Sequence, residues 1–286
     1  MDLCDIGQIR ALLSGPGFRF SKSMGQNFLT AAWVPERIAL EAGLDGKTGV
    51  LEIGPGIGCL TVQLSRLAGK VLSVELDRAL APVLEKTLKD CENVRVIFGD
   101  VLKLDIPGLV RESFAGLKPV VCANLPYNIT SPLISAFIDA GCFESMTLMV
   151  QREVARRICA KAGTGDYGAF TVYTNWYTEP EILFDVSPDC FIPAPKVWSS
   201  VIRLSTRSEP PERLIDERLF FTVVRAAFNQ RRKTLVNALT SGLAGYSKET
   251  LSEAIAACGF NPLIRGEALD IAGFAAVTNF LAEQRS

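Results

Sequence analysis

One stretch of this sequence leaves little choice of architecture: an apolar run leads into three glycines and then into a helical pattern. "TGVLEIGPGIG" is apolar up to Ile53 and has glycine at positions 54, 56 and 58, and "CLTVQLSRLA" follows with helical spacing. Glycine lets a backbone approach a ligand closely, and a helix N-terminus presents free N–H groups. This order of elements predicts a ligand site at the carboxyl end of a parallel strand.

The same alternation continues along the chain. "KVLSVELD", "VRVIFGD", "KPVVCANLPY" and "MTLMVQ" have strand patterns, and segments with helical spacing separate them. Alternating strands and helices predict an α/β fold with a Rossmann-like, mostly parallel sheet and helices on both faces. Ligands of such sheets bind beyond the carboxyl ends of the strands, where Glu75, Asp100 and Asn124 lie in this sequence.

A second, smaller domain follows. "TRSEPPERL", residues 206–214, is polar and contains two prolines, as linkers commonly do. The remaining segments have helical spacing. We therefore expect a larger domain over residues 1–205 and a small all-helical domain over residues 212–286.

Composition excludes several classes of site. The chain of 286 residues has no histidine, and its eight cysteines include no C-x-x-C pair, so we expect no metal site, no disulfide framework and no histidine-based catalysis. No apolar run is long enough to span a membrane, and the N-terminus lacks the pattern of a signal peptide. We expect a cytoplasmic protein. The net charge of −1 means that nucleic-acid binding would depend on local basic clusters.

The glycine segment is compatible with two cofactors. A dinucleotide site prefers G-x-G-x-x-G, but position 59 is cysteine. The observed E-x-G-x-G-x-G pattern, with Gly54 and Gly56, resembles that of class I S-adenosylmethionine methyltransferases. Glu75 would then bind the ribose hydroxyls, and Asp100 would accept a hydrogen bond from the adenine amine. The alternative is a plain strand–helix turn with Asp100 as a helix N-cap.

The tetrapeptide "NLPY", residues 124–127, ends the strand pattern "KPVVCANLPY". The Asn124 side-chain oxygen and the Leu125 carbonyl can accept the two N–H groups of an adenine amine, so that its lone pair points at a donor methyl group. Pro126 restricts Leu125 to extended conformations, and Tyr127 offers a ring face on which a base can stack. An isolated Asn-x-Pro turn is the structural alternative.

Motifs over nearly the whole chain resemble the ribosomal RNA adenine dimethylase family, in particular its bacterial KsgA branch. They are "GQNFL" (25–29), "LEIGPGIGCLT" (51–61), "VELD" (74–77), "GDVL" (99–102), "NLPYNITSPLI" (124–134), "QREVARRI" (151–158), "FIPAPKVWSSV" (191–201) and "AFNQRRKTL" (227–235). The resemblance implies S-adenosyl-L-methionine as cofactor and N6,N6-dimethylation of two adjacent adenosines near the 3′ end of 16S rRNA. The expected partner is the immature 30S subunit, and we expect a monomer with no membrane or metal partner. The resemblance also implies that residues 1–205 bind the cofactor and catalyse the reaction, and that residues 212–286 dock the substrate.

The same resemblance assigns roles to residues. It implies cofactor contacts at Asn27, Leu29, Gly54, Gly56, Glu75, Asp100 and Asn124, and a target clamp at Asn124, Leu125, Pro126 and Tyr127. Phe191 resembles the second aromatic that sandwiches the target base, with a core position as the alternative.

Two basic clusters are candidate phosphate contacts. They comprise Arg152, Arg156 and Arg157 in one segment and Arg231, Arg232 and Lys233 in another, and Arg19 and Lys22 precede "GQNFL". Ion-paired or solvated surface positions are an equally good interpretation for each arginine.

Three alternative functions follow from these patterns. Erm-type methyltransferases act on 23S rRNA and confer macrolide resistance, but they typically have "SQNF" and "NIPY", whereas this chain has Gly25 and Leu125. An NAD-dependent dehydrogenase is disfavoured by Cys59 and by the lack of histidine. A ribosome-assembly factor without catalysis is disfavoured by the intact Asn124, Gly54 and Glu75.

Overall fold

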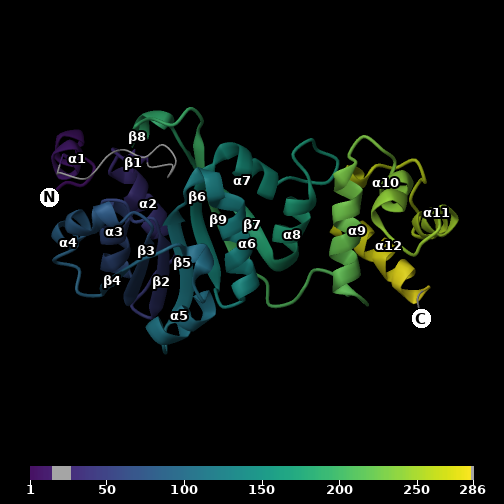
Figure 1. Ribbon diagram of the computed structural model, residues 1–286, viewed down its shortest axis with the longest axis horizontal. Coiled ribbons are helices and arrows are strands. Elements are labelled where there is room, and N and C mark those ends of the chain that lie inside the picture. The colour runs from purple at the N-terminus through teal and green to yellow at the C-terminus, as the bar shows by residue number, and fades with distance from the viewer. Residues whose placement is uncertain (15–26, 285–286) are drawn as a thin grey trace. The chain divides into compact units, whose positions relative to one another are not determined.

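The computed structural model describes residues 1–14 and 27–284 (Figure 1). Gly25 and the candidate RNA contacts Arg19 and Lys22 lie outside the described residues. The contacts divide the chain into two compact units. The first contains Met1–Ala155 and Pro180–Thr206, and the second contains Arg156–Glu179 and Arg207–Ser286.

The first unit is built on a seven-stranded sheet of order β4-β3-β2-β5-β6-β9-β7. The strands are β2 (Thr48–Ile53), β3 (Lys70–Glu75), β4 (Val94–Phe98), β5 (Lys118–Asn124), β6 (Ser145–Gln151), β7 (Thr178–Val186) and β9 (Ser199–Thr206). The pairs β3–β4, β2–β3, β2–β5 and β5–β6 are parallel, and β6–β9 is antiparallel. The expected mostly parallel sheet is confirmed.

The two strands β9 and β7 at one edge of the sheet were not expected from the sequence. β7 contains Pro180 and begins with the polar residues "TEPE", a pattern that weakens its strand signal. An edge position explains why the strand tolerates this proline, because an edge strand has N–H groups that need no ladder partner.

Helices cover both faces of this sheet (Figure 1). They are α1 (Ile6–Leu13), α2 (Trp33–Glu41), α3 (Cys59–Leu67), α4 (Ala81–Thr87), α5 (Ile106–Ser113), α6 (Thr130–Ala140) and α7 (Arg152–Ile158), with the short 3-10 turns η2 (Arg78–Leu80), η3 (Val101–Lys103), η4 (Tyr127–Ile129) and η5 (Pro188–Cys190). One core cluster joins α2 and α3 to the sheet through fully buried side chains such as Ile38, Leu64 and Val50. This burial supplies the main stabilisation of the unit.

A two-stranded antiparallel sheet lies beyond the main one. β1 (Phe28–Leu29) pairs with β8 (Phe191–Ile192), with Leu29 opposite Phe191. Because β1 directly follows Asn27, this pairing fixes the "NFL" segment near the carboxyl ends of the parallel strands.

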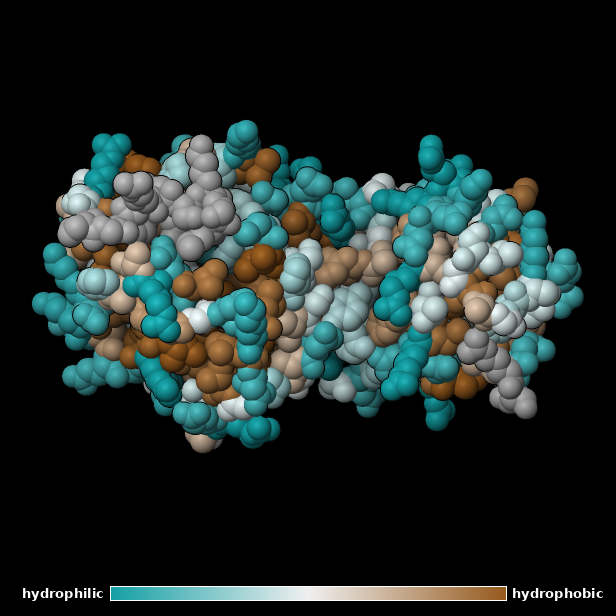
Figure 2. Space-filling view, in the orientation of Figure 1, coloured by the Kyte–Doolittle hydropathy of each residue, from teal (hydrophilic) through white to brown (hydrophobic). Residues whose placement is uncertain are grey.

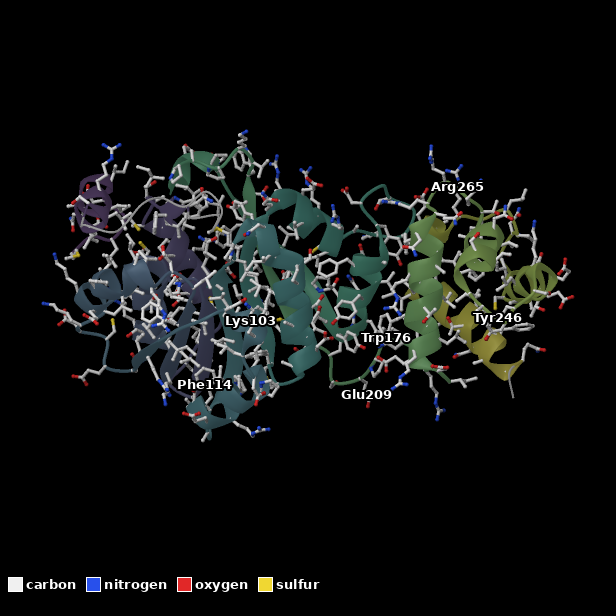
Figure 3. All side chains as sticks on the ribbon, viewed as in Figure 1. Lys103, Phe114, Trp176, Glu209, Tyr246 and Arg265 are labelled. Carbon is white, nitrogen blue, oxygen red and sulfur yellow. The ribbon has the colours of Figure 1, made fainter. Side chains whose placement is uncertain are left out.

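The second unit is helical. It contains α8 (Ala169–Tyr177), α9 (Glu217–Asn229), α10 (Leu235–Gly242), α11 (Lys248–Ala257) and α12 (Ile271–Glu283), with the turn η6 (Gly266–Ala268). Trp176 of α8, labelled in Figure 3, packs on Phe220 of α9 with ring centroids 4.6 Å apart. In Figure 2, hydrophilic side chains follow α9 on the visible face of this unit, in agreement with its exposed Arg218 and Arg225.

The compact units do not coincide with the domain limits expected from the sequence. Residues 156–179 precede the linker, yet Tyr167, Val172 and Trp176 belong to the core of the helical unit. The apolar face of α8 is buried against α9, so this segment groups with the later helices. The assignment of separate functions to residues 1–205 and 212–286 stays a prediction.

Within the described residues, no helix is both long and apolar enough to cross a membrane.

Candidate cofactor and substrate site

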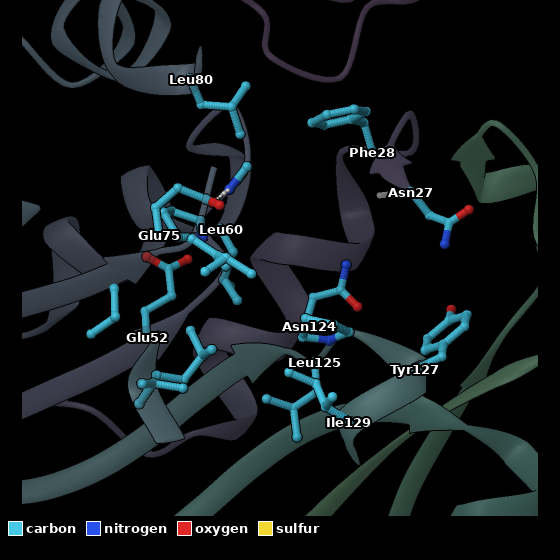
Figure 4. A pocket seen from close by; sticks show the side chains of 18 of the residues that line it. Asn27, Phe28, Glu52, Leu60, Glu75, Leu80, Asn124, Leu125, Tyr127 and Ile129 are labelled. Carbon is cyan, nitrogen blue, oxygen red and sulfur yellow. Dashed lines mark hydrogen bonds between the residues drawn. The ribbon is translucent and has the colours of Figure 1, made fainter. Parts of the chain in front are cut away.

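A cavity of about 270 Å³ opens at the carboxyl ends of β2, β3 and β5 (Figure 4). Five parts of the chain that are distant in sequence form its wall: the start of β1, the glycine loop after β2, the end of β3, the end of β4, and the loop after β5. The wall includes all the expected cofactor residues and all four residues of "NLPY", namely Asn27, Leu29, Gly54, Gly56, Glu75, Asp100, Asn124, Leu125, Pro126 and Tyr127. The structure therefore places the residues of these separate motifs around one cavity.

The glycine loop has backbone conformations that favour glycine. Gly54 has φ +66° and Gly56 has φ +61°, both in the left-handed region that L-side chains rarely adopt. The Gly54 N–H donates to the Val74 carbonyl at 2.9 Å, which ties the loop to β3. A Cβ atom on Gly56 would lie 3.3 Å from Cε1 of Phe28. Glycine here keeps open a cradle that a side chain would fill, which fits a bound cofactor.

The Glu75 carboxylate lies at the end of β3, facing this loop. Its Oε2 accepts the Gly56 N–H at 3.2 Å (Figure 4). Its Oε1 accepts the Asp77 N–H at 2.8 Å. Burial raises the pKa of Glu75, while these backbone N–H groups oppose the rise. The side chain is only 6% exposed, so its orientation is set before any ligand binds. Its role as the ribose-binding acid stays a prediction.

Asp100 lines the cavity and also caps a turn. Its Oδ1 accepts the Leu102 N–H at 3.1 Å, and its Oδ2 lies 3.4 Å from Nζ of Lys103. The helix-capping alternative is therefore present in the structure. It does not compete with cofactor binding, because a carboxylate has lone pairs for several donors.

Glu52 is a wall residue that the sequence analysis did not single out. This glutamate of β2 is 1% exposed, and its Oε2 accepts hydrogen bonds from Thr61 Oγ1 at 2.8 Å and from Ser73 Oγ at 2.6 Å. Burial raises its pKa to about 7, against the effect of the two hydroxyls. Its position as the first residue of E-x-G-x-G-x-G was the available signal.

The loop after β5 presents two hydrogen-bond acceptors. Asn124 is the last residue of β5, opposite Met149 of β6, and its carboxamide makes no hydrogen bond with any other described residue. The Leu125 N–H donates to the Met149 carbonyl at 3.1 Å, and within the described residues the Leu125 carbonyl receives no hydrogen bond. Both residues line the cavity, and neither oxygen has a hydrogen-bond donor among the described residues.

Tyr127 is the fourth residue of this motif and is half-buried. Its hydroxyl lies 2.6 Å from Oγ of Ser199, the first residue of β9. Burial raises the pKa of Tyr127, so the phenol stays neutral near pH 7. The bond to Ser199 anchors the ring at its far end and leaves its faces to define one side of the cavity (Figure 4).

Phe191 occupies a different environment. It is 4% exposed, pairs with Leu29 and belongs to the core cluster with Phe184 and Val186. It is absent from the described wall of the cavity. The structure thus places Phe191 in the core position that the sequence left open as an alternative, and its stacking role stays a prediction.

The basic clusters differ in how far their members are already engaged. Arg231 Nη2 donates to the carbonyls of Gly165 at 2.8 Å and Tyr167 at 3.0 Å. Arg152 lies 3.9 Å from Asp185. The remaining candidates have exposed side chains, and one of them, Arg157, also interacts with another group: they are Arg156, Arg157, Arg232 and Lys233. Arg231 therefore has a structural task, and RNA contacts at any of these positions stay predictions.

Among residues 1–14 and 27–284, no group of three or more Cys, Asp or Glu side chains is placed to hold a metal ion.

Comparison with known proteins adds independent information. The family model "Ribosomal RNA adenine dimethylase" matches residues 17–263. The chain is 45% identical over 284 residues to "Ribosomal RNA small subunit methyltransferase A" of Geobacillus thermodenitrificans, covering 98% of this chain and 97% of that protein. A protein of the same name from Listeria innocua is 44% identical over 287 residues, covering 99% and 97%.

Solved structures with the same fold include two RNA-modifying enzymes. The 23S rRNA methyltransferase ErmE has a TM-score of 0.70 and 28% identity, with 89% of this chain and 99% of that chain covered. A dimethyladenosine transferase from Plasmodium falciparum has a TM-score of 0.72 and 25% identity, with 87% and 95% covered. Both resemblances extend over most of the two units.

Proposed function

The chain belongs to the ribosomal RNA adenine dimethylase family, and from this membership we propose that it dimethylates the N6 amines of two adjacent adenosines near the 3′ end of 16S rRNA. It is an S-adenosyl-L-methionine-dependent methyltransferase. The relatives with 44–45% identity are named for the small ribosomal subunit, whereas ErmE, named for 23S rRNA, is 28% identical. The small subunit is accordingly the favoured substrate.

The observation that carries the proposal is that two free acceptors and a cofactor cradle share one cavity. The Asn124 carboxamide and the Leu125 carbonyl make no hydrogen bonds to described residues there. The glycine loop and the Glu75 carboxylate form another part of the same wall. A methyl donor and an amine acceptor can thus be held within one enclosed volume.

The cofactor would be held by the residues of this cradle. When bound, S-adenosyl-L-methionine supplies a methyl group activated by attachment to a sulfonium sulfur. Gly54 and Gly56 allow close approach of the backbone, Glu75 accepts hydrogen bonds from ribose hydroxyls, and Asp100 accepts one from the adenine amine. Asn27 and Leu29 close the cavity from the side of β1.

The "NLPY" residues would orient the target amine. The amine lone pair of adenine is delocalised into the ring, so the free amine is a poor nucleophile. Acceptors on both of its N–H groups favour a pyramidal nitrogen with its lone pair directed at the methyl group. Tyr127 would stack on the base, and its bond to Ser199 at 2.6 Å holds the ring in place for that contact. Positioning therefore accounts for most of the rate.

A strong general base is not needed. The amine nitrogen becomes acidic once it carries a new methyl group, so its proton leaves readily to solvent. An amide acceptor adds no negative charge next to the sulfonium. A carboxylate in the same place would partly neutralise the positive charge of the sulfonium.

We further propose that the substrate is presented within an immature 30S subunit, in the cytoplasm, and that the enzyme works as a monomer during subunit biogenesis. The helical unit would contribute docking contacts.

The test is incubation with labelled cofactor and 30S particles that lack the modification, followed by mapping of the labelled adenosines. Label on two adjacent adenosines near the 3′ end of 16S rRNA supports the proposal. Label on 50S particles alone would instead indicate the Erm-type activity. Mature 30S particles and naked 16S rRNA serve as controls for presentation of the substrate.

A further inference from the structure

An exposed indole directly precedes the residue that bonds to Tyr127. Trp198, in the segment between β8 and β9, is 41% exposed, and its neighbour Val197 is 44% exposed. An uncovered indole here is surface that a ligand can use.

The backbone of Trp198 is fixed by the start of α7. The Arg152 N–H donates to the Trp198 carbonyl at 2.9 Å, and the Arg152 guanidinium carbon lies 5.2 Å from the centre of the indole ring. This distance is within the range of a cation–π contact. A cation and an aromatic face are therefore presented together.

The guanidinium keeps part of its charge available. Arg152 Nη1 lies 3.9 Å from Oδ2 of Asp185, and the two side chains are 36% and 43% exposed. Such an exposed pair is weak. Asp185 is also engaged by Ser200, whose Oγ donates to Oδ1 at 2.5 Å. Arg152 can hence contact a phosphate without breaking a buried ion pair.

The backbone of Trp198 is linked to the target clamp through Ser199. Ser199 follows Trp198 in the chain, and its Oγ lies 2.6 Å from the Tyr127 hydroxyl. Consecutive Cα atoms are about 3.8 Å apart. The platform and the ring that lines the target cavity are thus separated by one residue and one hydrogen bond.

We propose that Trp198 and Arg152 form a stacking platform for the RNA nucleotide next to the target adenosine, with the indole under the base and the guanidinium near its phosphate. The proposal rests on the proposed function. A base that leaves its stack to enter a cavity deprives its neighbour of a stacking partner, and an aromatic ring replaces that partner whatever the neighbour's identity. This tolerance suits an enzyme that must place two adjacent adenosines in one site in turn.

The matched variants are Trp198→Ala, Trp198→Phe and Trp33→Ala. Trp33 is 45% exposed, but its ring contacts Phe184, 6.0 Å away, and it does not line the cavity. Affinity is measured for a single-stranded RNA oligonucleotide with two adjacent adenosines, for 30S particles lacking the modification and for the cofactor. The cofactor affinity reports whether each variant is folded.

Trp198→Ala should bind the oligonucleotide about 5- to 150-fold more weakly, as expected for the loss of one stacked base. Trp198→Phe should retain most of the affinity, and Trp33→Ala should match the wild type. Arg152→Gln should make the salt dependence shallower by about 0.7 in logarithmic slope.

Oligonucleotide affinity that is unchanged in Trp198→Ala would overturn the platform. So would a loss confined to 30S particles, which would indicate a ribosomal protein as the partner. Methylation by the wild type tests the proposed function separately: if the wild type methylates no adenosine in any particle, the proposed function fails. The platform is judged from the ratio of variant to wild-type affinity.

Discussion

The Ser73 hydroxyl donates a 2.6 Å hydrogen bond to Oε2 of Glu52, a carboxyl group that is 1% exposed on the wall of the cavity. Thr61 donates to the same oxygen at 2.8 Å. Among the described residues, the titratable groups that interact electrostatically with Glu52 are Glu75 on β3, Cys59 on α3 and Cys122 on β5, and none of these three is a cation. Burial without a positive partner explains why the proton is held more tightly than in water.

The burial of Glu52 makes stability depend on pH. The pKa of Glu52 is raised from 4.5 to about 7 in the folded chain, so between these values the folded state holds a proton that the unfolded state has released. The contribution of Glu52 to the free energy of unfolding is therefore largest below pH 4.5, falls as the pH rises to 7 and is constant above. Glu52→Gln keeps an acceptor for both hydroxyls but cannot ionise.

We expect Glu52→Gln to gain stability relative to the wild type as the pH rises from 5 to 8, by about 3 kcal/mol at most. Urea denaturation at several pH values in that window measures this difference. Parallel stability curves for the two proteins would contradict the raised pKa.

Asn124→Ala should lose most of the methylation while it stays folded. Removing one positioned hydrogen-bonding group at a reacting centre typically lowers kcat by about 10²- to 10³-fold. The carboxamide makes no hydrogen bond with another described residue, so the thermal midpoint should hardly change. Single-turnover methylation of 30S particles, together with calorimetric cofactor binding, separates catalysis from binding. Full activity in this variant would refute the amine clamp.

Gly56→Ala can be compared with Gly43→Ala. The two glycines have φ values of +61° and +63°, but a Cβ on Gly56 would lie 3.3 Å from Phe28, whereas none of the described atoms comes within 4 Å of one on Gly43. Both substitutions should cost about 1–2 kcal/mol of stability through backbone strain. We expect only Gly56→Ala to weaken cofactor binding as well, measured by calorimetry. Equal cofactor affinities in the two variants would show that the loop is not a cradle.

Arg231 and its neighbour Arg232 should respond differently to substitution. Arg231→Ala removes hydrogen bonds to the Gly165 and Tyr167 carbonyls and should lower the free energy of unfolding by about 1 kcal/mol, since the side chain is 43% exposed. Arg232→Ala should leave stability unchanged and affect RNA binding alone. Thermal denaturation and RNA affinity of both variants check this. If Arg231→Ala is as stable as the wild type, Arg231 has no structural role.

Much of the architecture could be predicted because periodic apolar patterns report local structure directly. β2, the glycine loop and α3 were read correctly, since a buried parallel strand, left-handed glycines and a helix N-terminus each leave a local signature. β7 and β9 were not predicted. β7 is an edge strand that contains Pro180, and β9 pairs antiparallel with β6, so neither has the local signature of a buried parallel strand.

The site shows the same division. The sequence by itself determined which residue types can form the site: the glycines after β2, the acids that end the strands, and the "NLPY" acceptors. Only the tertiary structure decided that Asn27, Glu75 and Asn124 share one cavity, that Arg231 serves the fold, and that α8 joins the helical core. Such juxtapositions depend on contacts between residues far apart in the chain, and those contacts are set by packing and burial rather than by local pattern.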